Sequence, residues 1–218
     1  MKTADESLMT TVDANNTHYS TTTIDMLRHG ECEGGACYRG KFTDHPLSNK
    51  GLQQMADKIE AQRVSWDRII SSPLKRCASF ANKLSATHAI PLELNDDLKE
   101  ISFGQWEGQL TEDIWLSQPN NVELWLKDPV RYPPPEGEAA DVFSNRVVSV
   151  CESLVQQHAG EKLLMVCHGG VMRALLGYCL SMQFECLSRF EVPYACFSRI
   201  QIITDGKKNY YRLINHNI

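Results

Sequence analysis

Basic side chains follow three apolar segments of the sequence that each have the composition of a β-strand. Arg28 and His29 come directly after "TIDML", and His168 follows "LLMVC". The third segment, "DRIISS", is followed by Arg76 within "PLKR". Guanidinium and imidazole groups bind anions, and together they can neutralise a phosphoryl group without a metal ion. A neutral imidazole can also attack phosphorus as a nucleophile.

A nucleophilic histidine needs one unprotonated ring nitrogen, so an acceptor must hold its other N–H group. The backbone carbonyl of Gly30, next to His29, is a candidate acceptor. The alcohol released from a phosphate ester also needs a proton, which a carboxylic acid can supply. Glu100 and Glu107 in "LKEISFGQWEG" are both candidates, and the residues alone do not choose between them.

These side chains can meet only if the segments before them end at the same edge of a sheet. In the first half of the chain, segments with the two-residue period of a strand alternate with segments that have the 3.6-residue period of a helix. Strands are predicted over 23–27, 67–72 and 90–95, and helices over 46–62 and 73–88. Ser48 is the expected N-cap of the first helix, and Pro73 fits the first turn of the second. Such alternation predicts an α/β fold with a largely parallel sheet, which binds ligands at the carboxyl ends of its strands.

The second half continues this pattern after an irregular stretch rich in Trp and Pro. It predicts helices over 138–159 and 171–182, a strand over 161–167 and a closing hairpin over 199–216. We therefore expect residues 23–218 to form a single domain with a helical or loop insertion near 105–135. Residues 1–22 have low hydrophobicity, which predicts a disordered N-terminal extension.

Composition restricts the class of protein. The net charge of −5 argues against a general nucleic-acid binder, which would carry a surplus of Lys and Arg. No apolar run is long enough to span a membrane, and the first residues lack the apolar region of a signal peptide. The eight cysteines form no C-x-x-C pair, and several lie in apolar segments. This usage indicates reduced thiols, so we expect a soluble, cytoplasmic protein.

The loop after His29 is also compatible in part with other chemistry. His29-x-Glu31 could begin a zinc deaminase site, but the P-C-x-x-C segment that such a site needs is absent from the sequence. Cys32 and Cys37 do not lie in the H-C-x-x-x-x-x-R pattern of cysteine phosphatases, so ordinary buried thiols are the better interpretation. We expect neither a metal nor a cofactor.

Aromatic residues crowd the insertion, and two interpretations of them stay open. They could form a small hydrophobic core under a long loop, which we favour, or one ring could stack on a flat base of the substrate. The residues in question are Trp106, Trp115, Trp125 and Tyr132.

Six blocks of the sequence resemble the ordered motifs of a known family. They are "LRHGE", "LSNKGLQQ", "SSPLKR", "LKEISFGQWEG", "PEGEAADVFSNRV" and "VCHGG". In this order, across residues 24 to 203, they look like the histidine phosphatase superfamily, which includes the cofactor-dependent phosphoglycerate mutases. The resemblance implies a three-layer α/β/α sandwich with a mostly parallel mixed sheet and a helical insertion beside the site.

The resemblance also implies roles for the candidate residues. His29 would be the nucleophile that becomes phosphorylated. Three residues would bind the phosphoryl group: Arg28, Arg76 and His168. Glu100, the first Glu of the family's L-x-E-x-x-x-G-x-x-E-G block, would be the proton donor, and Glu107 would support the loop.

Gly40, Thr43 and Gly169 complete the expected substrate-binding set. The chain also departs from the family's R-H-G-E-T-x-x-N pattern, because Cys32 replaces the Thr and Gly35 replaces the Asn. That Asn commonly contacts phosphate in the family. The departure therefore puts one phosphate contact in doubt and leaves the catalytic set complete.

Within the superfamily, "YRGKFTDHPLS" and "LSRFEVPYACFSRIQI" look most like the α-ribazole-5′-phosphate phosphatases of cobalamin nucleotide-loop assembly. We expect a metal-independent phosphomonoesterase that acts on a small-molecule phosphate monoester. The alternatives are a broad-specificity sugar or nucleotide phosphatase, a mutase-type phosphotransferase and a non-catalytic binder of phosphorylated ligands. The sequence leaves the oligomeric state open, with a dimer as one alternative.

Overall fold

Six strands form one mixed sheet in the computed structural model, which describes residues 19–218. The strand order is β3-β2-β4-β1-β5-β6. The strands are β1 (Ser20–Arg28), β2 (Arg68–Ser71), β3 (Leu92–Leu94), β4 (Lys162–Cys167), β5 (Phe197–Thr204) and β6 (Asn209–His216). The first four strands of that order are parallel, whereas β5 pairs antiparallel with both β1 and β6. The predicted hairpin, β5–β6, is confirmed.

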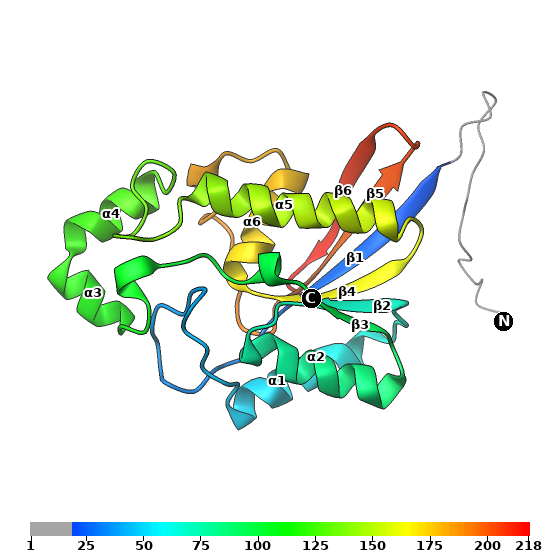
Figure 1. The fold of residues 1–218 in the computed structure, drawn as a ribbon, viewed down its shortest axis with the longest axis horizontal. Helices are drawn as coiled ribbons and strands as arrows, with labels where there is room; N and C mark the ends of the chain where they lie inside the picture. The colour runs from blue at the N-terminus through cyan, green and yellow to red at the C-terminus, as the bar shows by residue number, and fades with distance from the viewer. Residues whose placement is uncertain (1–18) are drawn as a thin grey trace.

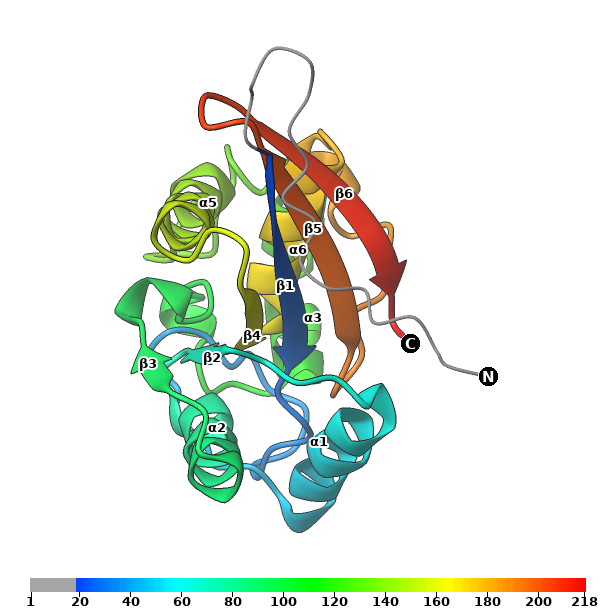
Figure 2. The same ribbon diagram turned by 90° about the vertical axis from the view of Figure 1, so that its right-hand side faces the viewer.

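Helices cover both faces of the sheet. Figures 1 and 2 show α1 and α2 on one face and α5 and α6 on the other, with α3 and α4 at one end. The α-helices are α1 (Asn49–Gln62), α2 (Lys75–His88), α3 (Thr111–Ser117), α4 (Pro119–Lys127), α5 (Ala140–Gln157) and α6 (Gly169–Cys179). Three short 3₁₀ helices are η1 (Asp96–Leu98), η2 (Gly104–Trp106) and η3 (Phe184–Cys186). The fold is the three-layer α/β/α sandwich that the sequence predicted.

Each face of the sheet has its own hydrophobic core because side chains of a strand alternate between its two faces. Met26 packs in the cluster that α5 and α6 cover, and its neighbour Leu27 packs in the cluster under α1 and α2. Both side chains are fully buried. A strand buried on both faces ends in a fixed position, which places the residues that follow it.

Element boundaries show where sequence patterns succeeded and where they failed. The predicted N-cap of α1 is confirmed, since Oγ of Ser48 accepts the N–H of Gly51 at 3.0 Å. Pro73 lies before α2, which begins at Lys75 because Leu74 is still extended. Residues 20–22, predicted as part of the extension, belong to β1 and pair with β5. The rest of the predicted extension, residues 1–18, lies outside the described residues.

The insertion near 105–135 contains α3 and α4 and has a small core of its own. This core consists of Tyr38, Trp106, Ile114 and Val122, with Phe103 and Trp125 packed against it. Trp106 is fully buried, and its Nε1–H donates to Oε1 of Gln118 at 3.1 Å. The core interpretation of the insertion aromatics therefore holds for Trp106, whereas Trp115 is 43% exposed.

A buried ion pair links β1 to β5. Asp25 is fully buried and accepts hydrogen bonds from Nε of Arg199 at 2.6 Å, Nη2 of Arg199 at 2.8 Å and Nε1 of Trp66 at 2.8 Å. Asp25 and Arg199 are register partners in the antiparallel ladder. A one-residue slip would separate them, so the pair stabilises this register.

Replacing Asp25 with Ala is expected to lower the free energy of unfolding by about 3 kcal/mol, because it leaves Arg199 and Trp66 without their acceptor. Urea unfolding of the purified protein measures this change. Asp96→Ala is the matched control, because Asp96 pairs with Lys99 at the surface and its side chain is 80% exposed. That control should cost less than about 1 kcal/mol. Equal losses in the two variants would contradict a stabilising role for the buried pair.

In the described part of the chain, residues 19–218, no helix is both long and apolar enough to cross a membrane.

Candidate active site

Three predicted site residues meet where β1 and β4 end. These strands are parallel neighbours in which Arg28 lies opposite Cys167, so His29 and His168 follow at the same edge of the sheet. Their ring centroids are 5.3 Å apart, in an edge-on arrangement. Residues that are far apart in the sequence are thus brought together by the strand order, as the sequence predicted.

Backbone geometry fixes the tautomer of His29. Its Nδ1 lies 2.8 Å from the carbonyl oxygen of Gly30, the acceptor that the sequence suggested. Since that carbonyl can only accept, Nδ1 carries the hydrogen and Nε2 is left unprotonated. Burial, then the charges of Arg28 and Arg76, hold the pKa of His29 well below its usual value. The imidazole is therefore neutral and can act as a nucleophile at Nε2.

Cys32 lies beside this histidine. Its Sγ is 3.5 Å from Nδ1 of His29 and 3.6 Å from the carbonyl oxygen of Gly30. Burial raises the pKa of the Cys32 thiol, so the group stays protonated near neutral pH. This supports the interpretation of Cys32 as an ordinary buried thiol.

Arg76 is fully buried and holds His168 in place. Its Nε–H donates to Nδ1 of His168 at 3.2 Å, and its other nitrogens donate to the carbonyl oxygens of Thr43 at 2.7 Å and Gly40 at 3.0 Å. Because Nδ1 of His168 accepts, Nε2 carries the hydrogen and donates to Oγ of Ser72 at 2.7 Å. Burial, then the charge of Arg76, lowers the pKa of His168 well below its usual value.

The guanidinium nitrogens of Arg28 differ in their hydrogen-bond partners. Its Nη1 donates to the carbonyl oxygen of Val192, and its guanidinium lies 4.5 Å from the ring centroid of Tyr194. Its Nε is buried, and among the described residues it has no hydrogen-bond partner. Burial lowers the pKa of Arg28, with Glu100 opposing the shift. An anion at this position would supply the missing acceptor.

Glu100 rests on the N-terminus of α6. Its Oε2 accepts the N–H of Gly170 at 3.0 Å, and its Oε1 accepts the N–H of Ile101 at 3.0 Å. A Cβ at position 170 would lie 2.2 Å from Oε1 of Glu100, so a glycine is required there for this close approach.

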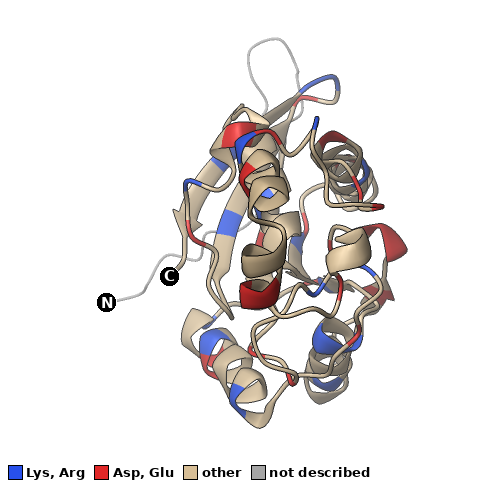
Figure 3. Ribbon diagram, turned by 90° about the vertical axis from the view of Figure 1, so that its left-hand side faces the viewer, with Lys and Arg blue, Asp and Glu red and all other residues tan. Residues whose placement is uncertain are grey.

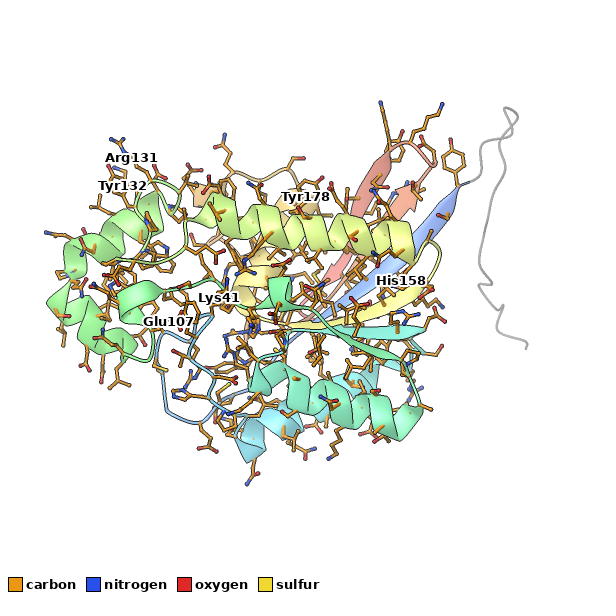
Figure 4. All side chains as sticks on the ribbon, viewed as in Figure 1. Lys41, Glu107, Arg131, Tyr132, His158 and Tyr178 are labelled. Carbon is orange, nitrogen blue, oxygen red and sulfur yellow. The ribbon has the colours of Figure 1, made fainter. Side chains whose placement is uncertain are left out.

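Glu107 makes a different set of contacts. Its Oε2 accepts the N–H of Phe42 at 2.9 Å, the N–H of Thr43 at 2.7 Å and Oγ1–H of Thr43 at 3.0 Å. Its Oε1 accepts the N–H of Phe103 at 3.2 Å. Figure 4 shows Glu107 next to the loop that carries Lys41. Glu107 thus ties this loop to the insertion, as the resemblance implied.

A cavity of about 390 Å³ opens at this edge of the sheet. Four predicted site residues line it: Arg28, His29, Glu100 and Gly169. Arg76 and His168 are fully buried around it, and Gly40 and Thr43 lie one layer further away, where their carbonyl groups hold Arg76. The other wall is apolar: Ile101, Phe103, Trp125, Leu126, Pro129, Phe143, Phe184 and Leu187. Trp125 is thus the insertion aromatic that belongs both to the small core and to the cavity wall.

Sequence reasoning missed two cavity-lining cations, Arg39 and Arg173. Arg39 is 8% exposed, and its Nη2 donates to the carbonyl oxygens of Glu33, at 2.8 Å, and Gly35. Gly35 itself is exposed with a φ of 69°. Arg173 lies one helical turn after Gly169, and this spacing could have pointed to it. No comparable signal marked Arg39.

The positive charge of the site lies inside the molecule. Figure 3, which looks toward the insertion, shows Lys and Arg positions interspersed with Asp and Glu positions on the ribbon. Within residues 19–218 no group of three His, Cys, Asp or Glu side chains is arranged to hold a metal ion.

Stability should depend on pH because two buried histidines stay neutral in the folded protein. The pKa values of His29 and His168 are lowered by folding, so below about pH 6.5 the unfolded chain binds more protons than the native one. The free energy of unfolding should then fall by about 1.4 kcal/mol per pH unit for each histidine. Urea unfolding between about pH 7 and about pH 5.5 measures the slope. His29→Asn should roughly halve it, and a slope of zero in the unaltered protein would contradict this account.

The sequence profile of the histidine phosphatase superfamily (branch 1) matches residues 24–215. The match spans most of the 218 residues, and the chain belongs to that superfamily. It is 29% identical over 182 residues to the adenosylcobalamin/alpha-ribazole phosphatase of Escherichia coli K12, with 81% of this chain and 88% of that protein aligned. It is 31% identical over 170 residues to phosphoserine phosphatase 1 of Hydrogenobacter thermophilus, covering 76% of this chain and 78% of that protein.

A solved structure agrees with these relatives. The crystal structure of the alpha-ribazole phosphatase from Shigella flexneri matches with a TM-score of 0.77 and 27% identity, covering 90% of this chain and 96% of that one. The fold and the relatives together identify the chain as a phosphatase of the superfamily.

Proposed function

We propose that the protein is a metal-independent phosphomonoesterase that works through a phosphohistidine at His29. The observation that carries this proposal is the hydrogen bond from Nδ1 of His29 to Gly30, which leaves Nε2 unprotonated beside Arg28 in the cavity. Arg28 and Arg76 would hold the phosphoryl group, and the N-terminus of α6 would add N–H groups. His168 would join them by turning its Nε2–H from Oγ of Ser72 to the bound anion. No residue in this set needs a metal to act.

In the first half-reaction, a bond forms between Nε2 of His29 and phosphorus while the ester P–O bond breaks. The electron pair goes to the ester oxygen, which takes a proton from the carboxylic acid of Glu100. In the second, the oxygen of a water bonds to phosphorus as the P–N bond breaks. Glu100 then accepts the proton of the water, which restores both groups.

For the substrate, we propose α-ribazole 5′-phosphate in cobalamin nucleotide-loop assembly. The cavity supports this, since its lining combines cationic side chains with the rings of Phe103, Trp125 and Phe143, which suit a flat aromatic base. The alpha-ribazole phosphatases among the relatives support it as well. The free cysteines of residues 19–218 fit the reducing cytoplasm that this role requires.

A substrate panel tests this proposal. We expect kcat/KM for α-ribazole 5′-phosphate to exceed the values for 3-phosphoglycerate, fructose 2,6-bisphosphate and common nucleotides by about 10-fold or more, since the aromatic wall favours its base. Phosphoserine belongs in the panel because of the 31% identical relative. A flat profile would overturn the α-ribazole assignment, and a clear preference for phosphoserine would replace it. Chelator should leave every rate unchanged.

A further inference from the structure

Arg173 lines the cavity from α6 but has no role in the mechanism above. It is partly buried, and among the described residues it forms neither a hydrogen bond nor an ion pair with another side chain. A Cβ on Gly169 would lie 3.4 Å from Nη1 of Arg173 and 3.3 Å from Nε of Arg28. The two guanidiniums therefore flank the first residue of α6.

This arrangement is costly without a ligand. Burial, then the charge of Arg28, lowers the pKa of Arg173, and Glu100 opposes the shift. Two guanidiniums close together in a partly dry site repel each other. Ligand oxygens that accept from both would offset this cost, so the pair suits an oxygen-rich substrate.

The position of Arg173 indicates which part of the substrate it meets. The charges of Arg28, Arg76 and Arg39 lower the pKa of His29, the nucleophile of the proposed reaction. The Cα of Arg173 lies one helical turn beyond Gly169, but its side chain turns back, so that Nη1 would lie 3.4 Å from a Cβ on Gly169. Arg173 lines the cavity together with the apolar side chains of Ala174 and Leu187.

The position of Glu100 also indicates where the leaving group lies relative to Arg173. Its carboxyl group lies against Gly170, one residue after Gly169, and must reach the ester oxygen to protonate it. Arg173 is close enough to Glu100 for the two charges to interact, so the carbon atoms bonded to that oxygen would lie near its side chain. Oxygen substituents on those carbons are within the reach of a guanidinium.

We propose that Arg173 is a specificity-determining residue that binds an oxygen acceptor of the leaving group, close to the ester oxygen. It selects phosphate esters of hydroxylated or carboxylated alcohols over plain aryl esters. This inference rests on the proposed phosphatase reaction and names the class of alcohol that the same cavity accepts. It does not require that the alcohol be α-ribazole.

Arg173→Met tests the inference with three esters: phenyl phosphate, sn-glycerol 3-phosphate and 3-phosphoglycerate. Loss of a contact to an oxygen acceptor should lower kcat/KM for 3-phosphoglycerate by about 10- to 100-fold if the acceptor is a carboxylate. If the acceptor is a hydroxyl group, both glycerol-type esters should lose about 2- to 10-fold together. Phenyl phosphate, which has no further oxygen, should stay within about 2-fold.

Ratios between substrates in one preparation do not depend on how much of the variant is folded. Equal losses on all three esters would overturn the inference, because Arg173 would then act on the phosphoryl group or on folding. No loss on any ester would overturn it too. Arg68→Met is the matched control, since Arg68 starts β2 at the far end of the strand, and its ratios should not change.

Failure of the phosphatase proposal has a separate signature. If His29→Ala kept phenyl phosphate turnover, the phosphohistidine reaction would be wrong, whatever the ratios of the Arg173 variant. If the substrate panel showed no preference for α-ribazole 5′-phosphate, the α-ribazole assignment would be wrong, but the ratios expected for the Arg173 variant would stay the same. Arg173→Lys adds a last readout: it keeps the charge but not the planar fork, so it should recover activity on a carboxylate better than on hydroxyl groups.

Discussion

Replacing His29 with Ala should lower kcat/KM for 4-nitrophenyl phosphate by about 10⁴-fold or more. The reason is that the variant lacks the ring nitrogen that we propose to form the phosphoryl–enzyme bond, and an activated leaving group does not restore a missing nucleophile. Rapid quenching of the unaltered enzyme should also trap a phosphate that is stable in alkali and labile in acid. The variant should trap none.

His158→Ala is the matched control for this prediction. His158 lies after α5, at the end of that helix far from the insertion (Figure 4), and its Nδ1 is 3.3 Å from Oε2 of Glu161. Its loss should leave kcat/KM within about 2-fold. Retention of most activity in His29→Ala, or loss of activity with chelator in the unaltered enzyme, would show that another group or a metal performs the chemistry.

Replacing Glu100 with Gln should slow the release of poor leaving groups far more than that of good ones. An alkyl ester such as glycerol 3-phosphate needs a proton on its leaving oxygen, and its rate should fall about 10³-fold. The leaving group of 4-nitrophenyl phosphate departs without a proton, so the rate for this ester should fall by about 10-fold or less. A plot of log kcat/KM against leaving-group pKa would therefore become steeper in the variant.

Glu107→Gln is the comparison that separates the two carboxylates. Its four hydrogen bonds go to Phe42, Thr43 and Phe103, so its replacement should lower stability and all rates by a similar factor. If Glu107→Gln rather than Glu100→Gln steepened the leaving-group plot, the proton donor would be Glu107. The two candidates that the sequence left open are thus separated by the shape of the plot.

The sequence predicted most of the fold because strand and helix periodicities are local signals. β1, α1, α5 and the β5–β6 hairpin lie close to where the patterns placed them. The start of β1 was missed because Ser20–Thr22 are polar and become strand only by pairing with β5. The start of α2 was missed because proline fits a first helical turn but also fits the extended residues before one.

The site residues that directly follow strands could be predicted from the sequence, whereas those that reach the site through packing could not. His29 and His168 come after apolar strands, and the acceptor for His29 is its own neighbour, Gly30. Arg173 lies inside an amphipathic helix, where a lone cation normally indicates a solvated face. Ser72 joins the site only through Nε2 of His168, a contact across 96 positions of sequence.

The hydrogen bonds of Glu107 also connect the two parts of the site that would hold the phosphoryl group and the leaving group. The loop that they hold is the one whose Gly40 and Thr43 carbonyl groups fix Arg76, and the segment at the other end carries Phe103 of the cavity wall. A shift of either segment is therefore transmitted to the other through the carboxylate of Glu107. The two ends of one substrate should behave as cooperative ligands, so that an alcohol product and inorganic phosphate each tighten the binding of the other.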